Sequence, residues 1–157
     1  MTSFIIKKLT LIPGSFQMTD NLGLLVLRVF FGLSLFALHG LGKIANFSTV
    51  LAGFPDPVGI GAKASLVLAI FAETGAALFL VAGAFTRLAA AIAGFTMLVA
   101  FSGVHQCSLG AAPGELAFLY LGAFVVLMIA GGGCCSIDGW LRKRPAGGAN
   151  PRDAKPA

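Results

Sequence analysis

The chain has 157 residues, of which 57% are hydrophobic and 11% are charged, and its mean hydropathy is +0.93. A water-soluble domain keeps roughly a quarter of its residues charged, so this composition excludes an ordinary soluble globular protein and predicts a single-domain integral membrane protein. A net charge of +5 would suggest nucleic-acid binding in a soluble protein. Here the basic residues flank apolar segments, where they determine membrane topology instead, so we expect a lipid bilayer and no nucleic acid as the partner.

Four apolar segments are long enough to cross a bilayer, because about 20 helical residues span its hydrocarbon core. The first of them contains Arg28 and is not followed by a small-residue cleavage site, so we expect it to remain as a membrane span and not to be removed as a signal peptide. The sequence predicts an all-α fold, an integral membrane four-helix bundle. The predicted spans cover residues 22–41, 62–82, 86–104 and 115–130.

The basic residues are divided unequally between the two ends of this bundle. At one end we expect only Lys43 and Lys63, and the positive-inside rule therefore places both termini in the cytoplasm. The basic residues at the other end are Lys7, Lys8, Arg87, Arg142, Lys143, Arg144, Arg152 and Lys155. The predicted divisions of the chain are an N-terminal cytoplasmic or interfacial segment (1–20), the four-span domain (21–139) and a basic, disordered cytoplasmic tail (140–157).

The loop between spans 1 and 2 carries its own helical pattern. Apolar side chains recur at Phe47, Val50, Leu51 and Phe54, with spacings of three and four residues. This pattern predicts a short amphipathic helix that ends before Pro55 and lies along the outer interface, over one end of the bundle. An irregular loop is the alternative interpretation.

Two charged side chains fall inside predicted spans. Arg28 lies in span 1, and Glu73 lies near the centre of span 2. An ionisable group within a bilayer costs several kcal/mol unless it meets a partner or water, which makes both residues candidates for a functional site. Their similar depths in antiparallel neighbours lead to the hypothesis of a buried Arg28–Glu73 ion pair. Its role is either structural or the handling of protons or substrate.

A second polar group is expected at the outer end, formed by His39, His105, Glu115 and Lys43. Histidine titrates near neutral pH and donates hydrogen bonds, so these residues are candidates for contacting a quinone headgroup or transferring protons. The alternative is that they are polar residues at helix ends that face water. The His and Glu spacings lack a metal-binding motif, and we predict no metal. Arg87, at the start of span 3, is interpreted as a topology signal.

The three cysteines are Cys107, Cys134 and Cys135. They form no C-x-x-C motif and no zinc-ligand spacing. Adjacent cysteines form a strained disulfide at best, so the favoured interpretation is that they are small packing residues, and the sequence assigns them no chemical role.

The order of several short motifs makes residues 22 to 139 resemble the DoxX family of four-span bacterial membrane proteins. No motif is specific alone, but the ordered set is. The motifs are the run from Leu27-Arg28 to Phe36 with His39-Gly40 and Lys43, Phe54-Pro55-Asp56-Pro57, Glu73-Thr74-Gly75, the turn Gly83-Ala84-Phe85-Thr86-Arg87-Leu88, His105, Glu115, and Gly133 with Ser136-Ile137-Asp138.

The resemblance implies a bacterial plasma-membrane location. Family members are similar to the small membrane subunit of thiosulfate:quinone oxidoreductase or are associated with complexes for thiol and oxidative stress. It therefore implies a quinone-linked oxidoreductase subunit that receives electrons through a quinone or a soluble oxidoreductase partner. The alternatives are a non-catalytic scaffold that docks a partner enzyme, and a small-molecule or lipid permease; homo-oligomerisation stays open. The positions that match the family pattern are Arg28, His39, Glu73, Arg87 and His105.

Overall fold

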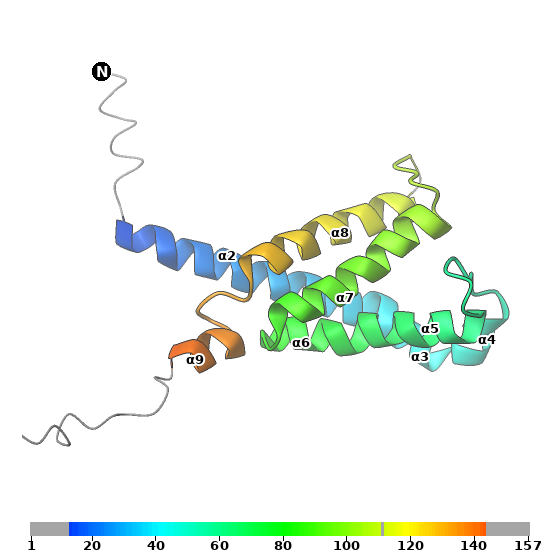
Figure 1. Cartoon of the computed structure of the whole chain (residues 1–157), viewed down its shortest axis with the longest axis horizontal. Helices are drawn as coiled ribbons and strands as arrows, with labels where there is room; N and C mark the ends of the chain where they lie inside the picture. The colour runs from blue at the N-terminus through cyan, green and yellow to red at the C-terminus, as the bar shows by residue number, and fades with distance from the viewer. Residues whose placement is uncertain (1–12, 111, 144–157) are drawn as a thin grey trace, which may run out of the picture.

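Four membrane-length helices form an up-and-down bundle (Figure 1). The structure is a computed structural model that describes residues 13–110 and 112–143. The helices long and apolar enough to cross a membrane, which we call spans 1 to 4, are Thr19–Ala45, Ala62–Ala82, Thr86–Val104 and Ala112–Ala130. The predicted all-α membrane fold is confirmed, with the bounds of spans 2 and 3 as predicted. Span 1 extends beyond the predicted 22–41 at both ends, and span 4 begins before residue 115.

Three of the spans change their helical winding, spans 1 and 2 near their middle and span 3 at its end. At η1 to η3 a backbone N–H bonds to the carbonyl of the residue five positions earlier, which is the π-helical pattern. Examples are the bonds from the Leu41 N–H to the Phe36 carbonyl and from the His105 N–H to the Ala100 carbonyl. The described elements are α2 (Pro13–Ser34), η1 (Leu35–Gly40), α3 (Leu41–Ala45), α4 (Phe47–Ala52), α5 (Ala62–Ile70), η2 (Phe71–Ala76), α6 (Ala77–Ala82), α7 (Thr86–Val99), η3 (Ala100–Val104), α8 (Ala112–Ala130) and α9 (Ile137–Lys143).

Each span packs against two others, so the four surround one core. Spans 1 and 3 each contact spans 2 and 4, and the α7–α8 contact is the most extensive. Small residues permit this approach, because an added Cβ at Gly32 would lie 3.0 Å from the Ala77 carbonyl oxygen. The buried core consists of Leu35, Ala76, Ala77, Leu80, Ala89, Ala90, Ala93, Met97, Tyr120, Phe124 and Leu127.

The two ends of the bundle differ in construction. We call the end with the 83–85 turn and α9 the turn end, and the end with α4 and residues 105–110 the loop end. Helix α4 confirms the predicted short helix between spans 1 and 2. In Figure 1, spans 2 and 3 meet at the turn end and diverge toward the loop end.

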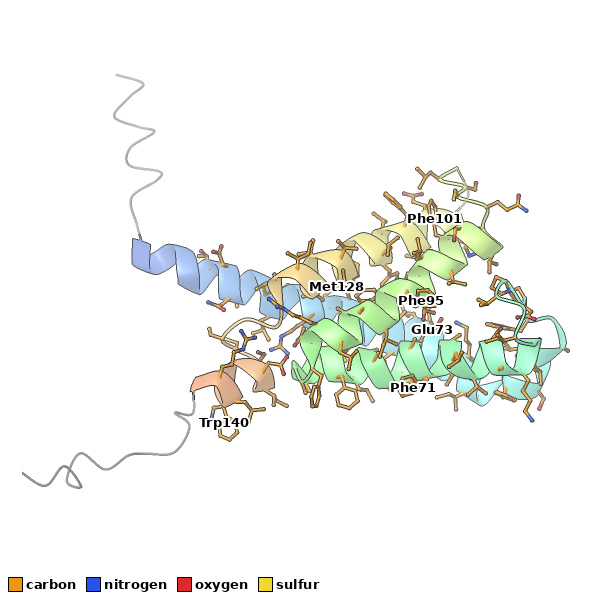
Figure 2. All side chains as sticks on the ribbon, in the orientation of Figure 1. Phe71, Glu73, Phe95, Phe101, Met128 and Trp140 are labelled. Atoms are coloured by element: carbon orange, nitrogen blue, oxygen red, sulfur yellow. The ribbon has the colours of Figure 1, made fainter. Side chains whose placement is uncertain are left out.

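The terminal predictions need correction where the structure describes them. Residues 13–20 continue directly into span 1 as the first turns of α2, instead of forming a separate segment. Residues 140–143 belong to α9, so the predicted disordered tail is wrong for them; Trp140 points away from the bundle there (Figure 2). The predictions for 1–12 and 144–157 lie outside the described residues.

Candidate functional site

Arg28 lies at the turn end and binds backbone carbonyls. Its guanidinium donates to the carbonyl oxygens of Val81 at 2.7 Å, Leu80 at 3.3 Å, and Cys135. The last residues of a helix have carbonyls without intrahelical partners, and a cation there also meets the negative end of the helix dipole. Arg28 therefore caps the end of span 2 and ties it to the segment after span 4. The predicted Arg28–Glu73 ion pair is wrong.

The register of spans 1 and 2 explains this error. Gly32 packs on Ala77 and Val81, whereas Gly40 packs on the Glu73 backbone, where an added Cβ would lie 2.9 Å from the carbonyl oxygen. Glu73 is therefore level with Gly40, about three helical turns from Arg28. The prediction aligned the two spans by assumed starting points, which placed Arg28 too far from the turn end.

Glu73 instead pairs with Lys43, which reaches it from α3. The carboxylate oxygen Oε2 of Glu73 accepts a hydrogen bond from the Lys43 ammonium. The Glu73 side chain is 6% exposed and the Lys43 side chain is 22% exposed. The attraction between the two opposite charges offsets the free-energy cost of removing each of them from water. Either charge alone at this depth would lack that compensation. Within the described residues this is the one ion pair between side chains, and it lies on the wall of a pocket.

The pocket lies between spans 2 and 3, where the two diverge. It has a volume of about 750 Å³. In Figure 2, Glu73 appears between the ribbons of these spans, with Phe71 on span 2 and Phe95 on span 3. We call it the lateral pocket. Its lining residues are Lys43, Phe54, Pro55, Pro57, Val58, Ile60, Ser65, Leu68, Ala69, Phe71, Glu73, Ala91, Ile92, Phe95, Thr96, Val99, Ala100, Val104 and His105.

The walls of the lateral pocket are almost entirely apolar, and its side opening faces the surroundings of the bundle. Phe71 and Phe95 line the pocket and are also 53% and 63% exposed. Since these residues lie in membrane spans, the opening faces lipid. At the loop end, segment 54–60 covers the pocket, and an added Cβ at Gly103 would lie 2.8 Å from Pro57, so this cover packs directly on span 3.

Hydrogen bonds from its own neighbours fix this cover. The Asp56 carboxylate accepts from the N–H groups of Gly61 at 2.8 Å and Ile60 at 3.1 Å, and from the Ser65 hydroxyl at 2.9 Å. These bonds, with that of Gly61 the strongest influence, hold the pKa of Asp56 below its usual value. Asp56 therefore stays ionised at neutral pH, and its hydrogen bonds attach the cover to the start of span 2.

His39 lies inside the bundle and does not line the lateral pocket. Its ring meets Tyr120 edge to face, with centroids 5.7 Å apart, and the Tyr120 hydroxyl donates to Ser34 at 2.8 Å. His39 therefore contacts Tyr120, whereas Lys43 pairs with Glu73.

Of the predicted outer group, Lys43 and His105 line the lateral pocket, whereas His39 and Glu115 do not. His105 lines the pocket at the loop end, immediately after η3. Glu115 is exposed on the first turn of α8 and lies outside the pocket lining. Within residues 13–110 and 112–143, no three His, Cys, Asp or Glu side chains gather closely enough to hold a metal ion.

Arg87 and Asp138 stabilise helix ends at the turn end. Arg87 donates to the Ile129 carbonyl at 3.1 Å, near the end of α8. Asp138 accepts from the N–H groups of Phe85 and Thr86, each at 2.8 Å, and so caps the start of α7. These contacts give Arg87 a structural role in addition to the predicted topology signal.

Sequence reasoning missed Tyr120 and the π-helical segments. Tyr120 is the single tyrosine of the chain, and a buried tyrosine hydroxyl needs a partner, so its position in an apolar span was a usable signal. Nothing in the residue pattern marked η1 to η3. They nevertheless carry His39 and Glu73 and directly precede His105, and π-helical segments recur at functional sites in proteins.

Comparisons with known proteins agree with this architecture. The DoxX family profile matches residues 23–106, which include most of span 1, spans 2 and 3, and all the residues that line the lateral pocket. A protein of Haemophilus influenzae (strain ATCC 51907 / DSM 11121 / KW20 / Rd), described as an uncharacterized protein, is 32% identical over 116 residues, covering 70% of this chain and 84% of the relative. No solved structure matches the chain. The chain belongs to the DoxX family.

Proposed function

We propose that the lateral pocket binds the headgroup of a membrane quinone, and that the protein is the quinone-linked membrane subunit of an oxidoreductase. The observation that carries this proposal is an apolar pocket of about 750 Å³ that opens to lipid and holds the Lys43–Glu73 pair in its wall. Pockets of this size and apolar character suit a small organic ligand fixed by a few polar groups.

The chemistry of the lining matches the two ends of a quinone. Quinone carbonyls accept hydrogen bonds, and an ammonium has three N–H donors, so Lys43 can bind a carbonyl while it stays paired with Glu73. His105 supplies a second donor at the loop end. The apolar tail leaves between Phe71 and Phe95 into the bilayer.

Reduction of a quinone to a quinol consumes two electrons and two protons. In this proposal a soluble oxidoreductase partner supplies the electrons, and Glu73, Lys43 and His105 are the titratable groups that exchange protons with the headgroup. His39 lies outside the pocket lining, against Tyr120. The protein lies in the bacterial plasma membrane with both termini in the cytoplasm, as its distribution of basic residues indicates.

The first experiment is mass spectrometry of an organic extract from the full chain, purified in mild detergent. We expect about one quinone per chain in the wild type. The variant Ala69→Phe places a ring in the pocket wall and should abolish retention of quinone. The matched control is Ala64→Phe, on the same helix α5, because Ala64 is exposed and lies outside the pocket lining.

The polar contacts are tested separately. His105→Ala should weaken quinone retention more than His39→Ala, because His105 lines the pocket and His39 does not. Quinone in the wild type would then justify assays with thiosulfate and other sulfur donors. Phospholipid alone in every sample would refute the quinone site. In that case, co-purification of a soluble oxidoreductase would support the scaffold alternative.

A further inference from the structure

Two adjacent thiols lie together at the turn end, far from the lateral pocket. Cys134 and Cys135 follow span 4, both are exposed, and their Sγ atoms are 3.7 Å apart. We propose that this pair is a chelating site for soft, thiophilic ions, of the class that includes trivalent arsenic, zinc and cadmium. The proposal is independent of the quinone site, because it uses different residues at the opposite end of the bundle.

The backbone on both sides of the thiol pair is held in place. The Cys134 N–H donates to Asn21 Oδ1 at 2.6 Å, and the Cys135 carbonyl accepts from the guanidinium of Arg28, which is itself 2% exposed. Two glycines with positive φ, Gly131 and Gly133, form the turn that brings the pair to this position. A dipeptide fixed at each end loses little conformational freedom when its side chains bind a ligand, which favours binding.

The sulfur separation suits a bridging ion better than a direct disulfide. Tetrahedral zinc with bonds of about 2.3 Å to two thiolates separates the sulfurs by about 3.8 Å, close to the separation observed here. The Cα atoms of a disulfide are usually at least about 4.4 Å apart, whereas neighbouring residues are about 3.8 Å apart across a trans peptide, so a disulfide between them is strained. Soft thiolate ligands select soft ions. The remaining coordination positions of a metal belong to water or small solutes.

Phenylarsine oxide is the sharpest probe for such a pair. Two As–S bonds form, the arsenic–oxygen bond breaks, and the oxygen leaves as water with both thiol protons, so arsenic keeps its oxidation state. The two bonds to one chain make release slower than from a single thiol by roughly a hundredfold. Cys107 provides an internal comparison, because it lies beyond span 3 at the loop end and cannot join the pair.

The experiment uses the reduced full chain in detergent, treated with phenylarsine oxide, washed with excess glutathione, and examined by intact-protein mass spectrometry. We expect one phenylarsenic group per chain that survives glutathione and is removed by a small dithiol. Cys134→Ser and Cys135→Ser should each lose the retained group, whereas Cys107→Ser should keep it. Thermal unfolding of each variant verifies that it is folded.

Three results would overturn the proposal. One is a reduced wild type that retains no arsenical, and another is retention by a folded Cys134→Ser or Cys135→Ser variant. The third is loss of the group in Cys107→Ser. None of these results bears on the quinone measurement, so the two proposals fail separately.

Discussion

At the scale of single residues, Lys43 and Glu73 show why charges inside a membrane protein occur in pairs. Each charge loses hydration when it enters the bundle, and their mutual attraction offsets that loss. Removing one partner leaves the other buried without compensation, whereas removing both leaves no charge to solvate. The pair is therefore more sensitive to a single substitution than to the double one.

We predict that Lys43→Met lowers the free energy of unfolding by about 3 kcal/mol, because the Glu73 carboxylate is then buried alone. The double variant Lys43→Met, Glu73→Gln should recover most of this loss. Thermal unfolding in detergent measures both. Lys63→Met is the control, because Lys63 is exposed at the start of span 2 and should leave stability unchanged. A double variant less stable than Lys43→Met would contradict the pairing.

At the scale of elements, α9 holds the turn between spans 2 and 3 from outside the bundle. Its Asp138 carboxylate caps α7, and its Asp138 N–H donates to the Gly83 carbonyl at 3.0 Å. Partial burial alone would raise the pKa of Asp138, but the hydrogen bonds from Thr86 and Phe85 outweigh it, and the pKa lies below its ordinary value. A lowered pKa in the folded state means that the ionised carboxylate stabilises the fold.

We predict that Asp138→Asn lowers the free energy of unfolding by an amount that depends on pH. The contribution of Asp138 is complete above the unfolded pKa of about 3.8 and disappears as the pH falls through the lower folded value. Near pH 7, Asp138→Asn should be less stable than the wild type by about 1 kcal/mol. The difference should shrink toward zero as the pH falls below about 3.8. The comparison uses the difference between the two proteins, because Asp56 also loses its hydrogen-bonded charge in acid. A difference independent of pH would refute the prediction.

A second element-scale prediction concerns the contact between η1 and η2. In Gly40→Ala the added Cβ would lie 2.5 Å from the Thr74 methyl and 2.9 Å from the Glu73 carbonyl oxygen, so the two spans must separate. We expect the free energy of unfolding, measured by thermal unfolding, to fall by about 1 to 3 kcal/mol. Gly42→Ala is the matched control two residues away, because nothing lies within 4 Å of its added Cβ. Equal effects of both substitutions would show that helix propensity, and not this contact, determines the outcome.

At the scale of the whole molecule, the native cysteines report the orientation in the membrane. Cys107 lies beyond span 3 at the loop end, and Cys134 and Cys135 lie beyond span 4 at the turn end. The proposed topology, with both termini in the cytoplasm, predicts that a membrane-impermeant maleimide labels Cys107 in spheroplasts and labels the pair only after lysis. Mass spectrometry of cysteine peptides measures this. The reverse pattern would place the turn end outside and overturn the proposed topology.

The sequence determined the architecture well because membrane spans depend on length and hydropathy, which are local properties. The bounds of spans 2 and 3 and the helix at 47–52 followed directly from such patterns. The site depends on register between helices, which hydropathy does not encode. The sequence singled out Arg28 and Glu73 as charges inside spans, yet their partners in the structure are backbone carbonyls and Lys43, respectively. The glycines at 32 and 40, which set the register, look like any other small residue in the sequence.

The π-helical segments have a consequence for the angular phase of each span. An α-helix advances about 100° per residue, and a π-helical turn is wider and holds an extra residue. The directions of side chains before and after η1 or η2 therefore do not follow the spacing of a single regular α-helix. The chain thereby directs Arg28 toward span 2 and His39 toward span 4 from a single continuous helix. Deleting one residue from such a segment would restore regular winding without shortening the span greatly. Because the wide turn accommodates its extra residue locally, the residues beyond the deletion, Lys43 included, should keep their directions.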